Sequence, residues 1–199
     1  MASKKAPASI KAIVNEPFKG HDRAKAKELV APGPAKKYQD LESVLKDLPS
    51  DQHMLNHMPP ITTKSPRVKE ELQNVEVGEC WMHAVAHEAD DDFHVILGSA
   101  SNPQAGAFMN SEICGVDKKS PAAKQLKQVR EMFVTELGLN TIGHTYNGYV
   151  KFHPPLHVTV RGSLFYDIDH PPPKVVGPQG MQAKTAWELH PLTSVKKLP

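Results

Sequence analysis

The sequence has few of the features that identify a reaction or a compartment. It contains two cysteines, Cys80 and Cys114, which lie inside apolar, strand-like runs, so we expect two buried free thiols rather than a disulfide framework. No apolar run approaches the roughly 18 residues of a membrane-spanning helix. The charged N-terminus is not followed by the apolar segment of a secretory signal. These absences predict a cytoplasmic protein that does not act in a membrane.

Motifs of covalent catalysis and of phosphate binding are missing as well. Ser163 lies in the middle of an expected strand and not on the sharp turn that exposes a catalytic serine, and neither cysteine has activating neighbours in sequence. Gly177 and Gly180 have the spacing of a turn and not that of a phosphate-binding loop. The sequence therefore assigns no catalytic residue, and it favours a binding protein over an enzyme.

The net charge of +2 is distributed unevenly along the 199 residues. Residues 1–66 hold 11 lysines and arginines against 7 acidic residues, whereas residues 67–199 hold 13 against 15. The second segment is therefore not basic, and a nucleic-acid partner that relies on phosphate contacts would need a local patch there. The basic excess lies in an N-terminal arm, which could bind nucleic acid or simply keep the chain soluble, and the second interpretation is favoured.

Prolines interrupt the first 66 residues so often that no long helix fits there. We predict a basic, disordered tail over residues 1–34 and short helices over residues 35–66 that dock on the domain. In the segment 38–48, apolar residues recur at helical spacing on one face. His53 and His57 have the i, i+4 spacing of a chelating pair on a helix, but no third ligand is near in sequence, so a docking turn is favoured.

The segment 67–199 reads as a β-rich domain with a single clear helix. Ser120 and Pro121 are typical of a helix start, and Gly138 is typical of a helix stop. Apolar runs of strand length occur at 75–88, 93–98, 107–116, 156–166 and 185–195. Three strands, one helix and two strands follow the order of the OB-fold, a five-stranded Greek-key barrel. We therefore predict a mainly β, OB-like barrel with the helix between strands three and four; a β-sandwich fragment with a surface helix is the alternative.

Two alternating sets of side chains in the first expected strand differ in character. The small, apolar set is predicted to point into the barrel, and it comprises Cys80, Met82, Ala84 and Ala86. The amphipathic set is predicted to face outward, and it comprises Trp81, His83, Val85 and His87. A glycine near the start of this long strand, Gly78, is typical of a coiled barrel strand.

Several motifs of the domain resemble a family of small, uncharacterised bacterial proteins. They are D-D-D-F-H-V-I-L at 90–97, S-P-A-A at 120–123, V-T-V-R-G-S-L-F-Y-D at 158–167, D-H-P at 169–171 and W-E-L-H-P-L at 187–192. The resemblance covers residues 61–195 and leaves the arm unmatched. It implies an OB-like barrel without an established activity, so it assigns no functional residue.

Two acid–histidine pairs near the end of the chain suggest a metal site. Asp169 and His170 follow the fourth expected strand, whereas Glu188 and His190 lie at i, i+2 on one face of the fifth, about 6.6 Å apart. If the two strand ends meet, these side chains could bind a divalent metal and activate a water molecule. The favoured alternative is structural: the histidines hydrogen-bond carboxylates or carbonyls and fasten the strand ends and the proline-rich loop.

A second candidate site is a ligand-binding face on the outside of the barrel. Its predicted residues carry groups suited to stacking on bases or contacting phosphates, and they are Trp81, His83, His87, Tyr149, Arg161 and Phe165. By fold analogy alone, the predicted function is a non-enzymatic binding module for single-stranded nucleic acid, without a cofactor. One alternative is a metal-dependent hydrolase or phosphodiesterase that uses His170, Glu188 and His190. Another is a structural or assembly protein whose arm docks a protein partner.

Overall fold

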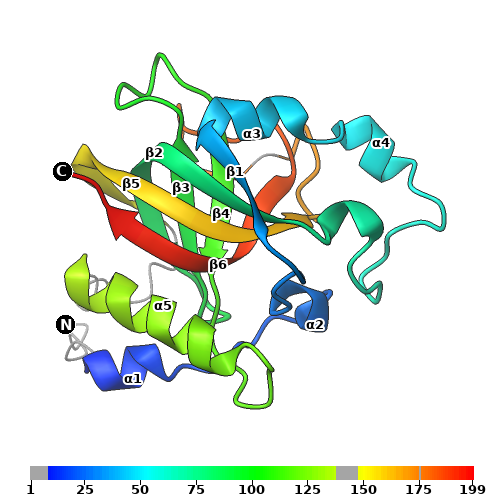
Figure 1. The fold of residues 1–199 in the computed structure, drawn as a ribbon, viewed down its shortest axis with the longest axis horizontal. Coiled ribbons are helices and arrows are strands. Elements are labelled where there is room, and N and C mark those ends of the chain that lie inside the picture. Colours follow the sequence, from blue (N-terminus) through cyan, green and yellow to red (C-terminus); the bar gives the residue numbers. More distant parts are fainter. Residues whose placement is uncertain (1–8, 138–147, 175) are drawn as a thin grey trace, which may run out of the picture.

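Strands β2 to β6 close into a barrel, and helices α1 and α5 lie together beneath it in Figure 1. The computed structural model describes residues 9–137, 148–174 and 176–199. Its helices are α1 (Ile10–Val14), α2 (Ala24–Lys27), α3 (Leu41–Asp47), α4 (Asp51–Leu55), the 3-10 turn η1 (Lys69–Glu71) and α5 (Ala123–Glu136). Its strands are β1 (Ala35–Asp40), β2 (Asn74–His87), β3 (Phe93–Gly98), β4 (Phe108–Ile113), β5 (Val150–Tyr166) and β6 (Trp187–Lys197).

The order of the strands around the barrel is that of an OB-fold. The wall runs β2-β3-β4-β6-β5, and the pairing of β2 with β5 closes it. Neighbouring strands are antiparallel except for β4 and β6, which are parallel. Helix α5 connects β4 to β5 and therefore follows the third strand of the barrel. The mainly β, OB-like architecture predicted from the sequence is confirmed.

Helix α5 packs against the barrel through one apolar stripe. Leu126, Val129 and Phe133 recur at helical spacing and are buried. Phe133 meets Phe93 of β3, with 5.4 Å between the ring centroids. The stripe was visible in the sequence, and its burial explains why this segment forms a helix beside a barrel.

The ends of α5 differ slightly from the prediction. Ser120, the predicted cap, accepts a hydrogen bond of 3.2 Å from the Ala122 amide, one turn before the helix proper. Gly138, the predicted stop, lies outside the described residues. Across 9–137, 148–174 and 176–199, no helix combines the length and the apolar character needed to cross a bilayer.

The sixth strand, β1, was not predicted. It pairs in parallel with the first half of β2, with Ala35 opposite Asn74 and Asp40 opposite Glu79. Its sequence, A-K-K-Y-Q-D, is polar and partly exposed, so it lacks the apolar alternation that marks a strand. The helix predicted next in the arm is present as α3, and Asp40 caps it by accepting a hydrogen bond from the Ser43 amide at 2.8 Å.

A β-bulge in β2 reverses part of the predicted inside–outside pattern. Cys80 and Met82 belong to the barrel core, as expected. Between Met82 and Ala84 the register with both neighbouring strands shifts, so Val85 joins the core while Ala84 packs with Ile96 on the outer face. The prediction that Ala84 points inward and Val85 outward was wrong, because one extra residue inverts the alternation of the strand beyond it.

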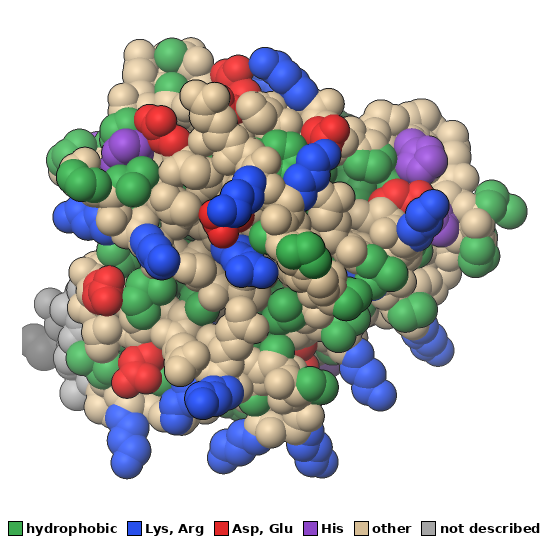
Figure 2. All heavy atoms as spheres, in the orientation of Figure 1, with side chains coloured by type: hydrophobic (Ala, Val, Ile, Leu, Met, Phe, Trp, Pro, Cys, Tyr) green, Lys and Arg blue, Asp and Glu red, His purple; other side chains and the backbone are tan. Residues whose placement is uncertain are grey.

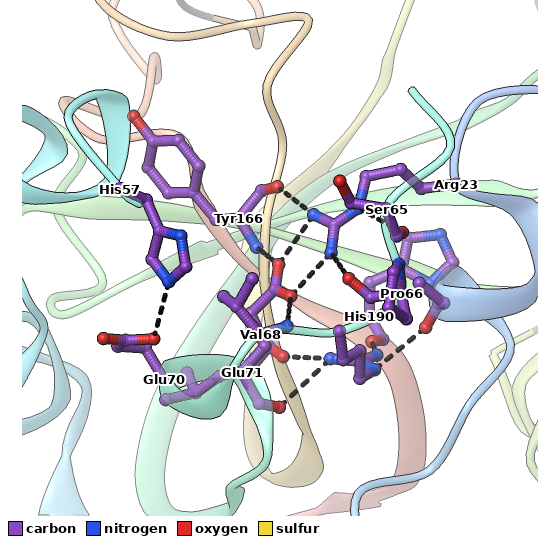
Figure 3. Close-up of polar contacts among 12 residues, drawn as sticks. Arg23, His57, Ser65, Pro66, Val68, Glu70, Glu71, Tyr166 and His190 are labelled. Atoms are coloured by element: carbon purple, nitrogen blue, oxygen red, sulfur yellow. Dashed lines mark hydrogen bonds and ion pairs between the residues drawn. The ribbon is translucent and has the colours of Figure 1, made fainter. Parts of the chain in front are cut away.

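Three buried charged residues, Arg23, Arg67 and Glu71, fasten the arm to the barrel, and we name them the anchor cluster. Figure 3 shows the Arg23 guanidinium and the backbone amide of Tyr166 directed at the Glu71 carboxylate. Arg23 donates hydrogen bonds of 2.6 and 2.8 Å to the two carboxylate oxygens, and the Tyr166 amide donates a third of 2.9 Å. The other donors of Arg23 reach carbonyls of Ser65, Pro66 and Tyr166. Every N–H of this guanidinium is therefore used.

Arg67 extends the anchor cluster to helix α2 and strand β6. Its guanidinium donates to the carbonyls of Ala26 in α2, Leu164 in β5 and His190 in β6. It also donates to the Glu71 carbonyl, at 3.3 Å. One buried side chain thus fixes the position of the arm relative to two barrel strands.

Residues 9–34 of the arm differ from the disordered tail predicted for 1–34. They contain α1 and α2, and Ile13 and Val14 of α1 are buried beside α5 (Figure 1). Residues 1–8 of that prediction lie outside the described residues. Because this part of the arm is docked, Lys27 is held against the barrel, where its Nζ lies 5.8 Å from the centre of the Phe165 ring.

Candidate metal centre

Three neighbouring strands carry acidic and histidine side chains on the outer face of the barrel. In each strand the polar residues recur at i, i+2, which places them on one side of the strand. They are Asp92 and His94 at the start of β3, Asn110, Glu112 and Cys114 in or just after β4, and Glu188 and His190 in β6. The register places His94 opposite Glu112 and Asn110 opposite Glu188, so the fold gathers the three sets.

His94, Glu112 and Glu188 form the candidate metal centre. One ring nitrogen of the histidine and one carboxylate oxygen of each glutamate all lie within 4.8 Å of one another. The three residues are only 4%, 7% and 2% exposed. Nε2 of His94, Oε1 of Glu188 and Oδ1 of Asn110 have no hydrogen-bond partner among the described residues. Such atoms are rare in folded proteins, and a cation at this place would satisfy them.

The other nitrogen of His94 is held by side chains outside the centre. Its Nδ1 lies 2.7 Å from the Tyr149 hydroxyl and 3.5 Å from Oε1 of Glu88. Burial opposes a charge on the ring, but Glu88 and Glu112 outweigh burial and raise the pKa of His94. Metal-binding histidines commonly use one nitrogen for the ion and the other for a hydrogen bond that fixes the ring. The surroundings of His94 match that pattern, with Nε2 left for a ligand.

A second group of ligand-type side chains, Asp92, Cys114 and His190, adjoins the centre. Their ligand atoms also lie within 4.8 Å of one another, and all three are buried. The Cys114 thiol lies 3.2 Å from Nδ1 of His190, and Oδ2 of Asp92 lies 3.6 Å from Nε2 of the same ring. Glu112 links the two groups, because its Oε2 lies 2.8 Å from Nε2 of His190.

The two glutamates of the centre are driven toward different charge states. Burial raises the pKa of Glu188, and the neighbouring Glu112 adds to that effect. Burial acts in the same direction on Glu112, but His190 and Lys27 outweigh it and hold its pKa well below the usual range. Burial also lowers the pKa of His190 itself, against the opposing effect of Glu112. The same carboxylates outweigh burial and raise the pKa of Lys27, which keeps it an ammonium group.

The structure separates the four side chains that the sequence suggested as metal ligands. Glu188 lies in the candidate metal centre, and His190 lies in the adjoining group. Asp169 and His170 are exposed and belong to neither set of converging ligand atoms in the described chain. Nδ1 of His170 instead lies 2.5 Å from Oδ2 of Asp167. His170 thus contacts a carboxylate, as in the favoured structural alternative, whereas Glu188 and His190 belong to a larger cluster.

Three of the six residues expected on a stacking face lie in β2 and do not belong to the candidate metal centre or to the group beside it. Trp81 stacks on His157 of β5, with 4.3 Å between the ring centroids. His83 is buried, and its Nε2 lies 2.9 Å from the Ala100 carbonyl. His87 is also buried, and it stacks on Phe93 with 4.4 Å between the centroids. These rings are already stacked or hydrogen-bonded within the protein.

The other three residues of that face divide between the centre and its surroundings. Tyr149 contacts the centre through its hydroxyl on His94. Phe165 is buried beneath the anchor cluster, 4.5 Å from the Arg23 guanidinium, and lies 5.7 Å from the His190 ring. Arg161 is half-buried in β5, opposite Glu76. Two of the six residues therefore border the site, though not by stacking on a common surface.

Sequence reasoning did not consider Glu112, and at Asp92 and His94 it favoured a solvated turn over a cation site. Taken alone, the D-D-D run at 90–92 is typical of a solvated turn, and Glu112 is hidden in an apolar run. The signal was present as the repeated i, i+2 spacing in D-F-H, N-S-E-I-C and E-L-H at 92–94, 110–114 and 188–190. Read together with the OB strand order, which makes these three strands neighbours, the spacing predicts a shared cluster.

Comparison with known protein families, with curated proteins and with solved structures finds no match to this chain. The resemblance to an uncharacterised bacterial family therefore stays a prediction. The function has to be argued from the site.

Proposed function

We propose that the protein is a metal-dependent hydrolase whose divalent ion is held by His94, Glu112 and Glu188. The observation that carries the proposal is the convergence of three buried ligand atoms within 4.8 Å, beside polar atoms that have no partner among the described residues. One imidazole and two carboxylates, with the amide oxygen of Asn110 nearby, suit Zn²⁺ or Mn²⁺. Such an ion supplies an activated water and stabilises negative charge on the substrate.

The position of the centre in the fold supports a role in handling a ligand. It lies on the outer face of β3 and β4, the second and third strands of the barrel. OB-folds bind their ligands on this face, between the loop that joins strands one and two and the loop that joins strands four and five. In this protein the second of those loops contributes Met181, which packs on Ile96 and Phe108 of the same face. Fold analogy and the ligand set thus favour the same place independently.

Positive charge beside the centre favours an anionic substrate, and we infer a phosphate ester. Lys27 stands among the carboxylates of the centre as an ammonium group. A surface pocket of about 550 Å³ reaches the group that adjoins the centre, because its wall residue Phe18 meets the His190 ring edge-on, with 6.4 Å between the centroids. Three exposed lysines line this pocket: Lys25, Lys118 and Lys119. Ammonium groups stabilise the charge that develops on a transferred phosphoryl group.

Single-stranded nucleic acid, the ligand predicted from the sequence, enters this proposal as a candidate phosphodiester substrate. On the face in Figure 2, lysine and arginine side chains are spread from the top to the lower edge, and acidic side chains lie among them. Proteins that track a strand through its phosphates gather such residues along a groove. Residues 67–199, which form the barrel, carry 13 basic against 15 acidic residues, so we favour recognition of one phosphodiester at the centre over binding of a long strand.

Metal binding and ester hydrolysis together test the proposal. Glu188→Gln removes a ligand while keeping the side-chain shape, and Glu131→Gln makes the same substitution on the exposed side of α5. We expect the wild type and E131Q to bind Zn²⁺ or Mn²⁺ in calorimetry and to hydrolyse bis-p-nitrophenyl phosphate. E188Q should bind the metal at least about tenfold more weakly and lose the hydrolysis.

The possible outcomes separate the parts of the proposal. A wild-type protein that binds neither metal would refute the centre. Metal binding without hydrolysis of this ester or of a single-stranded oligonucleotide would contradict the hydrolase and leave a metal-binding protein. Equal metal affinity in E188Q and E131Q would remove Glu188 from the ligand set.

A further inference from the structure

The group that adjoins the candidate metal centre has the composition of a zinc site of its own. Asp92 directly precedes β3, Cys114 directly follows β4, and His190 lies in β6, so the barrel order gathers three distant parts of the sequence. Their ligand atoms lie within 4.8 Å of one another. The side chains of Asp92 and His190 have no exposed surface, and Cys114 is 1% exposed. A thiolate, an imidazole and a carboxylate form a donor set that Zn²⁺ accepts readily.

Hydrogen bonds within the protein do not satisfy this group. Oδ1 of Asp92 accepts a hydrogen bond of 2.6 Å from the Gly115 amide, but Oδ2 has no hydrogen-bond partner in the described part of the chain. Oδ2 lies 3.6 Å from Nε2 of His190, which also lacks a well-aligned hydrogen bond there, although Glu112 is 2.8 Å away. Without an ion, the side chains that approach Asp92 are a second carboxylate, Glu112, and the poorly aligned ring of His190, so this fully buried carboxylate is paired only imperfectly, which is costly. A cation between these atoms removes that cost.

We propose that Asp92, Cys114 and His190 bind a second metal ion, beside the ion held by the candidate metal centre. The inference rests on the proposed function, because it takes the first site as one half of a two-metal centre. Glu112 lies between the halves: its carboxylate belongs to the first ligand set, and its Oε2 is 2.8 Å from Nε2 of His190. Two adjacent ions clamp the attacking and leaving oxygens of a phosphate ester, which fits the substrate class inferred above.

The thiol gives the second site a chemical signature that the first site lacks. Binding of the ion breaks the S–H bond of Cys114, forms a metal–sulfur bond and releases the proton to solvent. The first site contains no sulfur ligand. The other cysteine, Cys80, lies in the barrel core, where its Sγ is 3.5 Å from the Val158 carbonyl. Cys80 is therefore a matched control: it is a buried, free cysteine that is not part of the cluster.

Cobalt loading tests the second ion without reference to activity. The full chain is stripped of metal with a chelator and titrated with Co²⁺, while the visible and near-ultraviolet absorption is recorded. We expect two bound ions per chain and an intense near-ultraviolet band from thiolate-to-cobalt charge transfer. Cys114→Ala should lose this band and one of the two ions. Cys80→Ala should keep both.

Each result separates the second ion from the first. One cobalt per chain without the thiolate band would overturn the second ion and leave the proposed function intact, whereas no bound cobalt would overturn both. A band that survives in C114A but not in C80A would also overturn the site. If circular dichroism shows that C114A does not fold, the wild-type band still decides the matter, and Asp92→Asn, which keeps the thiol, is expected to bind one cobalt instead of two.

Discussion

Two buried clusters of charged side chains contact Phe165, and they differ in how their polar atoms are paired. The anchor cluster lies against the ring through Arg23 and Arg67, and the group beside the candidate metal centre reaches it through His190. Every donor of Arg23 and both carboxylate oxygens of Glu71 are hydrogen-bonded. Several partnerless atoms of the described chain instead lie in or beside the candidate metal centre, among them Nε2 of His94, Oε1 of Glu188 and Oδ2 of Asp92, while others lie elsewhere, on Glu70 and His157.

The difference distinguishes a structural cluster from a functional one. A fully paired buried network rigidifies the fold, because every desolvated group regains a partner. A partly paired network destabilises the chain unless a ligand completes it. Burial of charge is common to both clusters, so burial alone does not identify the site. The site is identified instead by ligand atoms that converge on one place and include atoms without a hydrogen-bond partner.

Removing the acid of the anchor cluster should have the largest effect on stability. Glu71→Ala leaves the Arg23 guanidinium buried without its counter-ion and removes the acceptor of the Val68 and Tyr166 amides. We expect the free energy of unfolding, measured by urea denaturation, to fall by about 3–5 kcal/mol.

The preceding residue gives the control. The Glu70 carboxylate is 23% exposed and faces two histidines of the arm, one of which is His57 in Figure 3. Glu70→Ala should cost less than about 1 kcal/mol, as is usual for ion pairs near the surface. Similar losses in the two variants would contradict the structural role assigned to the anchor cluster.

The candidate metal centre should behave in the opposite way, with a small effect of mutation until a metal is added. Burial raises the pKa of Glu188, so glutamine resembles its protonated form, and E188Q without metal should unfold within about 1 kcal/mol of the wild type. Zn²⁺ at a hundred times the wild-type dissociation constant should stabilise the wild type by about 2.7 kcal/mol, and a tenfold loss of affinity reduces the stabilisation of E188Q to about 1.4 kcal/mol.

Urea denaturation without metal measures the stability of E188Q relative to the wild type, and denaturation with Zn²⁺ measures the stabilisation by the ion. E131Q serves as the control for a Glu→Gln substitution outside the centre. Stabilisation of E188Q equal to that of the wild type would place the ion elsewhere. A metal-free E188Q that is as unstable as E71A would make the centre a second structural cluster and would remove the contrast between the two.

The fold could be predicted because its signals are local. The strands at 93–98 and 156–166 and the apolar stripe of α5 each show their own periodicity, and their order along the chain is that of the OB-fold. The polar strand β1 and the bulge after Met82 could not be predicted in this way. Strand β1 lacks the alternation of apolar and polar residues that marks a strand. The bulge becomes visible only in the pairing of β2 with β3 and β5.

The site could be predicted only in part, because its residues meet through the pairing of distant strands. Glu188 and His190 were recognisable as a pair within one strand. His94 and Glu112 become partners only through the register of β3 with β4, and Lys27 reaches the cluster because the anchor cluster docks the arm. The i, i+2 spacing marks the residues within each strand, but the pairing that brings the strands together is not encoded at short range.

The smallest effect is expected at the edge of the centre, where Asp167 pairs with His170. The hydrogen bond to Asp167 raises the pKa of His170 against the opposing effect of burial. A raised histidine pKa contributes stability in full below the unfolded value of about 6.5, and that contribution is lost as the pH rises through the higher folded value. His170→Gln should therefore destabilise the protein at pH 6 and have little effect at pH 9. Because the His170 side chain is 51% exposed, the loss should stay below about 1 kcal/mol.

This variant also marks where the functional cluster ends. His170 was a metal ligand in the sequence-based hypothesis, yet it is exposed and already paired with Asp167. Its replacement should therefore leave the affinity for Zn²⁺ within about threefold of the wild type, whereas loss of a first ligand costs tenfold or more. Urea denaturation at pH 6 and pH 9 checks the pH-dependent loss of stability, and calorimetry with Zn²⁺ checks the affinity for the metal. A pH-independent loss would contradict the ion pair. A tenfold loss of affinity would extend the metal centre to the loop after β5, and the partnerless atoms would then no longer mark its boundary.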